Sequence, residues 1–287
     1  MAVSTLQGAG ALLDELTSIV SKAAAAALAA RANGLEARTK PDQSPVTAAD
    51  EASEAVILDG VSRLLPGVPI LSEEAHSRSP AGPLGESFVL VDPLDGTREL
   101  LAGRDEFSIN LGLVQSGEPR LGIVAAPARG VLWRGAGPGS AERLHLPAGA
   151  PASAVRERTA IRPRPLPAAG IIAAVSRSHL DSETEAFLDR IPGVQLRRSG
   201  SAVKLCQVAE GSVDLYPRLA PVCEWDLGAG HAVLMAAGGI VIAPDGTPLS
   251  YGRKANGFIV SGFIAWGDPA APGKLGLAAP RSGRSGS

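Results

Sequence analysis

The sequence FVLVDPLDGTRELLAGRDEF, residues 88–107, places two acids directly after an apolar run. The apolar residues at 88–91 predict a buried β-strand, which ends at a turn stiffened by Pro93. Asp92 and Asp95 are three positions apart across this turn, so both carboxylates can face one point. Two carboxylates held close together repel each other unless a cation lies between them. The pattern favours Mg²⁺, which prefers a few carboxylates, waters and a substrate phosphate.

An ordinary surface turn is the alternative interpretation, because Asp-Gly and Pro-Leu-Asp-Gly are common turn sequences. Two further acidic ends favour a metal site. Upstream, Glu73 and Glu74 follow a short apolar run at 68–71, and far downstream Glu224-Trp225-Asp226 opens a predicted helix. Three separate strand or helix ends that each supply an acid are hard to explain as turns.

These motifs, in this order and at this spacing, resemble the inositol monophosphatase superfamily of metal-dependent, lithium-sensitive phosphatases. The resemblance is carried by SEEAH at 72–76, DPLDGT at 92–97 and WDLGAG at 225–230. Within the superfamily, SEEAH together with SRSH at 176–179 and YGRK at 251–254 is most similar to the CysQ-type 3′(2′),5′-bisphosphate nucleotidases. The resemblance covers most of the chain.

The residue pattern predicts an α+β / α/β layered sandwich made of two halves, and the resemblance implies the αβαβα sugar-phosphatase-like fold. Residues 1–150 are expected to form N-terminal helices and an antiparallel sheet that carry most metal ligands. Residues 151–267 repeat strand, loop and helix three times, which predicts an α/β half with a mostly parallel sheet. The tail at 268–287, rich in Pro, Gly, Ser and Ala, is expected to be disordered.

Two segments are predicted to be connections. The composition of 135–167 indicates a domain connection or a long insertion, although its arginines could also attract phosphate. Residues 76–86 are expected to form a mobile loop beside the site, with His76 solvated.

The resemblance also assigns the metal ligands. It implies that Glu73, Asp92 and the Leu94 carbonyl hold one Mg²⁺, and that Asp92, Asp95 and Asp226 hold a second. Two or three ions per site are expected. Asp226 would equally suit the cap of its own helix.

A second assignment concerns the attacking water. Thr47 is a good helix N-cap with Asp50 three positions on, a capping box with Asp in place of Glu, which explains both residues structurally. The resemblance adds that Asp50 hydrogen-bonds Thr97, and that Thr97 takes a proton from the water. The two roles are compatible.

Substrate contacts are expected in two places: around Gly96 and Thr97, in the turn at 94–97 that we call the phosphate turn, and at loop-to-helix junctions. Free backbone N–H groups at helix N-termini bind anions. A lone histidine is usually structural and a lysine on a helix is usually solvated, but the match to the nucleotidase pattern favours contact. The expected substrate-binding residues are Glu73, Leu94, Asp95, Gly96, Thr97, Ser176, His179, Ser201, Lys204 and Asp226.

The composition of the chain argues against nucleic-acid and membrane partners. The chain has 287 residues, 45% of them hydrophobic, and 27 Lys and Arg against 29 Asp and Glu give a net charge of −2. Without a basic excess, nucleic-acid polymers and anionic membranes are poor partners. Cys206 and Cys223 lack metal-ligand spacing, which favours two reduced thiols over a disulfide. A cytoplasmic monomer or homodimer without a signal peptide or transmembrane segment is expected.

The expected activity is Mg²⁺-dependent hydrolysis of the 3′-phosphate of adenosine 3′,5′-bisphosphate, a reaction tied to sulfur assimilation. Two features depart from the nucleotidase pattern: Arg98-Glu99-Leu100 stands where Lys-Glu-Phe is usual, and aromatic residues make up only 3% of the chain. An inositol or sugar-phosphate phosphatase is therefore an alternative. A non-catalytic nucleotide or metal sensor is an alternative from a different class, but such proteins usually lack a ligand that this chain retains.

Overall fold

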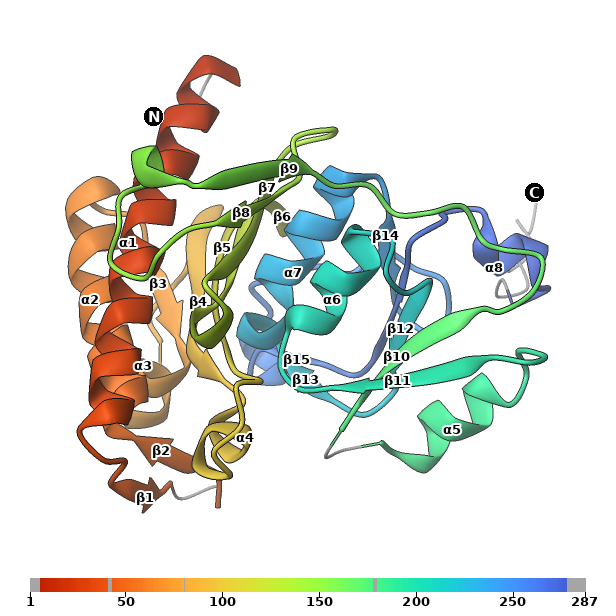
Figure 1. The fold of residues 1–287 in the computed structure, drawn as a ribbon, viewed down its shortest axis with the longest axis horizontal. Coiled ribbons are helices and arrows are strands. Elements are labelled where there is room, and N and C mark those ends of the chain that lie inside the picture. The colour runs from red at the N-terminus through yellow and green to blue at the C-terminus, as the bar shows by residue number, and fades with distance from the viewer. Residues whose placement is uncertain (1–5, 41–42, 80, 178–179, 278–287) are drawn as a thin grey trace.

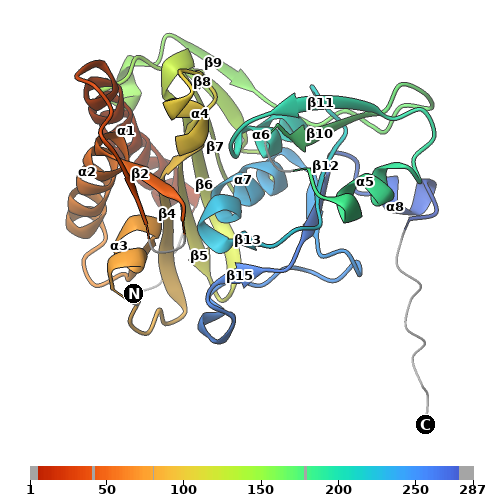
Figure 2. The same cartoon turned by 90° about the horizontal axis from the view of Figure 1, so that it is seen from below.

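The computed structural model describes residues 6–40, 43–79, 81–177 and 180–277. Its layers run from left to right in Figure 1 as helices, sheet, helices, sheet and helices. Figure 2, seen from below, shows the central helices between the two sheets. This is the predicted αβαβα sandwich. The helices are α1 (Leu6–Ala32), α2 (Ala48–Leu64), α3 (Glu73–Arg78), α4 (Thr97–Leu101), α5 (Ser182–Leu188), α6 (Val203–Ala209), α7 (Glu224–Ala237) and α8 (Ala271–Lys274).

The larger sheet has seven strands in sequence order. Its first pair is parallel and every later pair is antiparallel, so the predicted meander is confirmed. The strands are β3 (Ile70–Ser72), β4 (Ser87–Asp95), β5 (Ser108–Gln115), β6 (Glu118–Ala126), β7 (Val131–Ala136), β8 (Glu142–His145) and β9 (Glu157–Ala160). The prediction of a connection at 135–167 is wrong for the part that forms β8 and β9. The glycine- and proline-rich composition gave no sign of these two short strands, of which β8 pairs with the edge of β7 and β9 pairs with β8.

Helices α1 and α2 cover one face of this sheet because each carries a continuous apolar face. Leu16 and Val20 on α1 and Ile57 on α2 are completely buried, and they pack in one cluster with Val89 and Val91 of β4. Burying side chains of this size contributes about 1.5–3 kcal/mol each. The packing therefore fixes β4, and with it the acids at its end, against the helical layer.

The smaller sheet has the order β11-β10-β12-β16-β14. Four strands run in the same direction and β16 runs opposite to its neighbours, so the prediction of a mostly parallel sheet is confirmed. Helices α5 and α8 pack on its outer face. Its strands are β10 (Ile172–Ser176), β11 (Gln195–Ser199), β12 (Leu215–Arg218), β14 (Ile240–Ile242) and β16 (Phe263–Trp266).

Helix α7 lies between the sheets and packs closely against β6 and α6, because glycines stand at the points of contact on both sides. A Cβ added at Gly122 would lie 2.1 Å from the Ala229 carbonyl oxygen, and one at Gly230 would lie 2.5 Å from Leu205 Cδ1. Protein interiors at this density leave little freedom for the helix to shift. The N-terminal turn of α7, which contains Asp226, is thereby held near the end of β4.

The remaining elements frame the site. Strands β1 (Ala37–Thr39) and β2 (Pro45–Thr47) pair with each other, as do β13 (Val222–Cys223) and β15 (Ile259–Val260). Short 3₁₀ helices occur at Pro127–Arg129, Ala152–Ala154 and Lys254–Asn256. Cys206 and Cys223 are free, as expected. Among the described residues, no helix is both long and apolar enough to cross a membrane.

Two loop predictions are wrong. His76 lies on α3 and is half-buried, with its ring 5.6 Å from that of Trp225 and 5.4 Å from that of Phe258. The tail is not disordered from its start, because 268–277 form a turn and α8, and Ala271 is completely buried. In both places aromatic or aliphatic partners far away in sequence stabilise a segment of polar, loop-like composition. Residues 278–287 lie outside the described part of the chain.

Candidate active site

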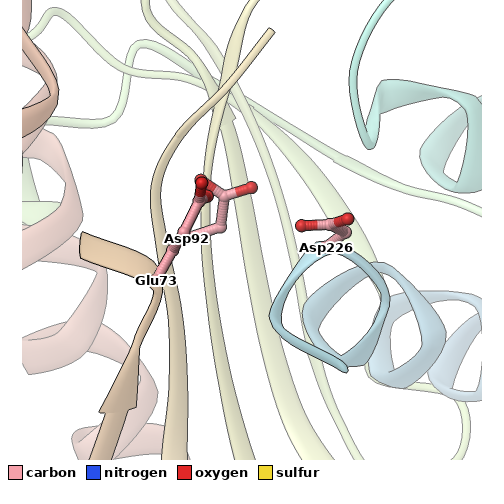
Figure 3. Close-up of side chains that lie close together, drawn as sticks. All are labelled: Glu73, Asp92 and Asp226. Atoms are coloured by element: carbon pink, nitrogen blue, oxygen red, sulfur yellow. The ribbon is translucent and has the colours of Figure 1, made fainter. Parts of the chain in front are cut away.

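Three elements bring a carboxylate to one point. Glu73 is the first residue of α3, Asp92 lies in β4, and Asp226 lies in the first turn of α7. One oxygen of each lies within 4.8 Å of the others. Figure 3 shows Asp226 on the helix directed toward Glu73 and Asp92. We call these three residues the acid cluster.

The electrostatics of the acid cluster favour a bound cation. Burial raises the pKa of Asp92 well above its usual range, and repulsion from Glu73 raises it further. Burial likewise raises the pKa of Asp226, with added repulsion from Asp95. Ionised carboxylates at this spacing are destabilised unless a positive charge compensates them. All the donors are hard oxygens, a set that fits Mg²⁺ or another hard divalent cation.

The two remaining predicted ligands lie on the same cavity wall. Leu94 and Asp95 line a cavity of about 310 Å³ together with the acid cluster. Asp95 is not a member of the three-acid group, and its surroundings differ. Burial raises its pKa, whereas Lys204, Arg218 and the Ala202 N–H lower it. Two cationic side chains, Lys204 and Arg218, therefore act on Asp95.

Asp50 and Thr97 meet at the edge of this cavity. The Thr97 hydroxyl donates to Asp50 Oδ1 over 3.0 Å, and the Thr47 N–H and hydroxyl donate to Asp50 Oδ2 over 2.9 and 2.6 Å. The predicted capping box is confirmed, and its Asp also holds Thr97. Burial raises the pKa of Asp50, while the bonds from Thr47 lower it. The cap thus orients a carboxylate whose second oxygen accepts the Thr97 hydroxyl.

The C-terminal half supplies further residues of the cavity lining, which we call the C-terminal wall. Of the expected substrate contacts, Ser176, Ser201 and Lys204 line the cavity, whereas His179 lies outside the described residues. Ser201 has a backbone φ of +54°, in the left-handed region that is costly for residues other than glycine. Its hydroxyl is buried and has no hydrogen-bond partner among the described residues. Such a group is available to a ligand.

Two cationic residues of the site were missed from the sequence. Lys40 Nζ lies 2.7 Å from Glu73 Oε1 and 2.6 Å from Glu74 Oε1. Burial lowers the pKa of Lys40, but the two glutamates raise it by more. In the sequence, Lys40 could have been recognised as a site residue from its position just before the proline-containing turn that leads to Asp50. Arg218, at the end of β12, also lines the cavity, and its signal was its place at a strand end.

The sequence model of the inositol monophosphatase family matches residues 6–270. The chain belongs to the inositol monophosphatase family. As a member of this family, it is a metal-dependent phosphatase.

Its relatives include 3′(2′),5′-bisphosphate nucleotidases. The CysQ of Escherichia coli K12, named a 3′(2′),5′-bisphosphate nucleotidase, is 40% identical over 225 residues, which cover 78% of this chain and 86% of that protein. The CysQ of Buchnera aphidicola is 34% identical and covers 79% of this chain and 82% of its own length.

Solved structures show the same fold. The crystal structure of CysQ from Bacteroides thetaiotaomicron superposes with a TM-score of 0.74 at 30% identity, over 92% of this chain and 99% of that one. The inositol monophosphatase from Anabaena superposes with a TM-score of 0.70 at 29% identity, over 93% of this chain and 95% of that one.

Proposed function

We propose that this family member uses Mg²⁺ to hydrolyse the 3′-phosphate of adenosine 3′,5′-bisphosphate to AMP and phosphate. The observation that carries the proposal is the mixed charge of the cavity lining, which holds the acid cluster together with the cationic side chains Lys204 and Arg218. A metal held by the acids would receive the scissile phosphate. Two cations in the same cavity suit a second phosphate, which inositol monophosphate lacks.

The metal ligands in this proposal are Glu73, Asp92, the Leu94 carbonyl, Asp95 and Asp226. Bound Mg²⁺, as two or three ions, would neutralise charge on the phosphate and acidify the attacking water. The protein's own contribution is to hold the carboxylates together before the substrate arrives. Helix α7 and strand β4 do so from opposite sides, and their close packing limits reorganisation.

Thr97 and Asp50 would handle the proton. Thr97 already donates its hydrogen to Asp50 Oδ1, so the lone pairs of its oxygen remain open to a water O–H. As the water oxygen attacks phosphorus, its proton passes to Thr97 while the Thr97 proton passes to Asp50. The raised pKa of Asp50 makes it a better proton acceptor than a solvated aspartate.

The phosphate would bind at the turn that follows Asp95. Gly96 has a φ of +100°, and a Cβ there would lie 2.8 Å from the Glu106 carbonyl oxygen, so only glycine fits. The N–H groups of Gly96 and Thr97 are the proposed donors to the phosphate oxygens.

The nucleotide end would lie against the C-terminal wall. Ser176, the unpartnered Ser201 hydroxyl and Lys204 are the proposed contacts, and His179 is proposed from the motif alone. Tyr216 and Phe263 also line this wall, with ring centroids 5.1 Å apart. In a chain poor in aromatic residues, they offer an apolar surface for the nucleoside.

A substrate panel tests the proposal. Phosphate release should be measured for adenosine 3′,5′-bisphosphate, inositol 1-phosphate and fructose 1,6-bisphosphate, with and without Mg²⁺. The highest kcat/KM is expected for the adenosine compound. Faster turnover of inositol 1-phosphate would reject the proposal. Nucleotide binding without phosphate release at any Mg²⁺ concentration would instead favour a sensor.

A matched variant sharpens the panel. Lys204→Met keeps the length of the side chain and removes its charge. It should lower kcat/KM for adenosine 3′,5′-bisphosphate about tenfold more than for adenosine 3′-monophosphate, because a charged hydrogen bond contributes about 1.5–3 kcal/mol. An equal loss for both substrates would argue against a second phosphate on this wall.

A further inference from the structure

Glu106, which none of the proposed steps uses, joins the two halves of the molecule beside the site. It lies in the loop between α4 and β5, and its carboxylate accepts from Arg177 Nε and Nη2 over 2.9 and 2.8 Å. The same carboxylate accepts the Gly200 N–H over 3.0 Å. Arg177 follows β10 and Gly200 follows β11, so one acid of the N-terminal half holds two strand ends of the smaller sheet.

The backbone of Glu106 packs closely between two glycines, Gly96 and Gly200. A Cβ added at Gly96 would lie 2.8 Å from the Glu106 carbonyl oxygen, and one added at Gly200 would lie 2.9 Å from that oxygen. Glu106 therefore separates the phosphate turn from the loop at 199–202 by the thickness of one backbone. Since side chains are excluded on both sides, the spacing between the two segments is set at this residue.

Ser201 depends on this arrangement for its shape. Glu106 accepts the N–H of the residue before it, and Asp95 accepts the N–H of the residue after it, Ala202. Between these two anchors Ser201 keeps its left-handed φ of +54°, a conformation that persists only where the surroundings enforce it. The next turn of chain begins α6 and carries Lys204.

We propose that Glu106 is a positioning residue for the second phosphate of the substrate. Through Gly200 and Arg177 it holds the Ser201–Lys204 segment at a set distance from the phosphate turn. The ligand class is a phosphomonoester that carries a second anionic group, and this part of the inference rests on the function proposed above. Hydrogen bonds from Arg177 lower the pKa of Glu106, so the carboxylate stays ionised at neutral pH.

The kinetic test uses Glu106→Gln, which keeps the shape but cannot accept all three hydrogen bonds. The KM for adenosine 3′,5′-bisphosphate should rise about tenfold while kcat changes by less than about twofold, because a charge-assisted pair is lost without touching the reacting atoms. The KM for adenosine 3′-monophosphate should not change. An equal rise in KM for both substrates would overturn the proposal.

The control is the neighbouring acid, Asp105→Asn. Asp105 pairs with Arg31 of α1 over 2.7 Å, a contact within the N-terminal half, and is more exposed than Glu106. Asp105→Asn should leave the KM values for both adenosine substrates unchanged. Arg177→Gln should reproduce the effect of Glu106→Gln, and the double variant should be no worse than either single variant. Additive effects would contradict a shared role.

A second measurement does not require activity. Amide hydrogen exchange at Gly200 and Ala202 in the ligand-free protein should become at least about tenfold faster in Glu106→Gln and stay unchanged in Asp105→Asn. If the bisphosphate proves not to be a substrate but exchange changes as expected, the proposed function fails and the anchoring role stands. Unchanged exchange in Glu106→Gln overturns the anchoring role.

Discussion

Asp92 and Asp214 are both buried, 1% and 2% exposed, but they are surrounded in opposite ways. Asp214 accepts from Arg164 Nε and Nη2 and from the Ile172 N–H, each over 2.7 Å. Asp92 accepts the Leu94 N–H over 2.9 Å, and its ionic neighbours are other acids. Removing one partner of a compensated buried pair is strongly destabilising, whereas a buried acid beside like charges is stabilised by protonation or by a cation from outside.

The largest expected effect is on Asp92. Asp92→Asn should lower kcat/KM on the order of 10³-fold, because a central ligand is lost from the proposed metal site. The metal-free variant should be at least as stable as the parent, since the substitution removes a repelling charge. Initial rates at saturating Mg²⁺ and thermal unfolding in EDTA measure the two effects. Loss of stability in EDTA together with retained activity would reverse the assignment of the two acids.

The converse change is Asp214→Asn. It leaves Arg164 without its ionic partner and should lower the free energy of unfolding by about 3 kcal/mol. Turnover should fall by less than about twofold, because Asp214 does not line the cavity. Urea unfolding and steady-state rates are the measurements. Asp59→Asn, which breaks the exposed pair with Arg63 on α2, is the control and should cost less than about 0.5 kcal/mol.

A smaller effect separates proton transfer from metal binding. Thr97→Ala should lower kcat about 100-fold, because the hydroxyl held by Asp50 is removed while the acid cluster stays intact. The rise in melting temperature caused by Mg²⁺ should be retained. Thr97→Ser should restore most of the rate. An unchanged kcat in Thr97→Ala would exclude this residue from the mechanism.

The smallest effect is a pH dependence of Mg²⁺ binding. Because burial and mutual repulsion raise the pKa values of Asp92 and Asp226, protons compete with the cation below those pKa values. Each proton released should weaken the apparent Kd by up to about tenfold per unit of falling pH. Calorimetry in buffers of different ionisation enthalpy counts the protons. Release of none would mean that the acids are already ionised without metal.

The stability of the metal-free protein should also depend on pH, through the pKa shift of Glu74. Burial raises the pKa of Glu74 from 4.5 to about 7, so its contribution is present below pH 4.5 and is lost as the pH rises through 7. The metal-free protein should therefore lose stability across this window, and Mg²⁺ should oppose the loss. Unfolding curves at several pH values, with EDTA or Mg²⁺, provide the comparison.

Local sequence was enough to predict that the acids lie at strand and helix ends and that α2 begins with a capping box. The acids follow apolar runs directly, and the cap of α2 involves residues only three positions apart, so their geometry depends on short stretches of backbone. Periodicity also predicted the two kinds of sheet, because each has its own pattern of alternation. The order of motifs along the chain was enough to indicate the family.

What depended on tertiary structure were the contacts between distant segments. Lys40 reaches Glu73 across 33 positions, and Arg177 reaches Glu106 across 71. The placement of β8 and β9 at the edge of the sheet, and of His76 against Trp225, likewise depends on how whole layers pack. Residue type and spacing specify which groups a short segment can offer. Which of them meet is decided by the packing of helices against sheets, which brings residues together regardless of their separation in the chain.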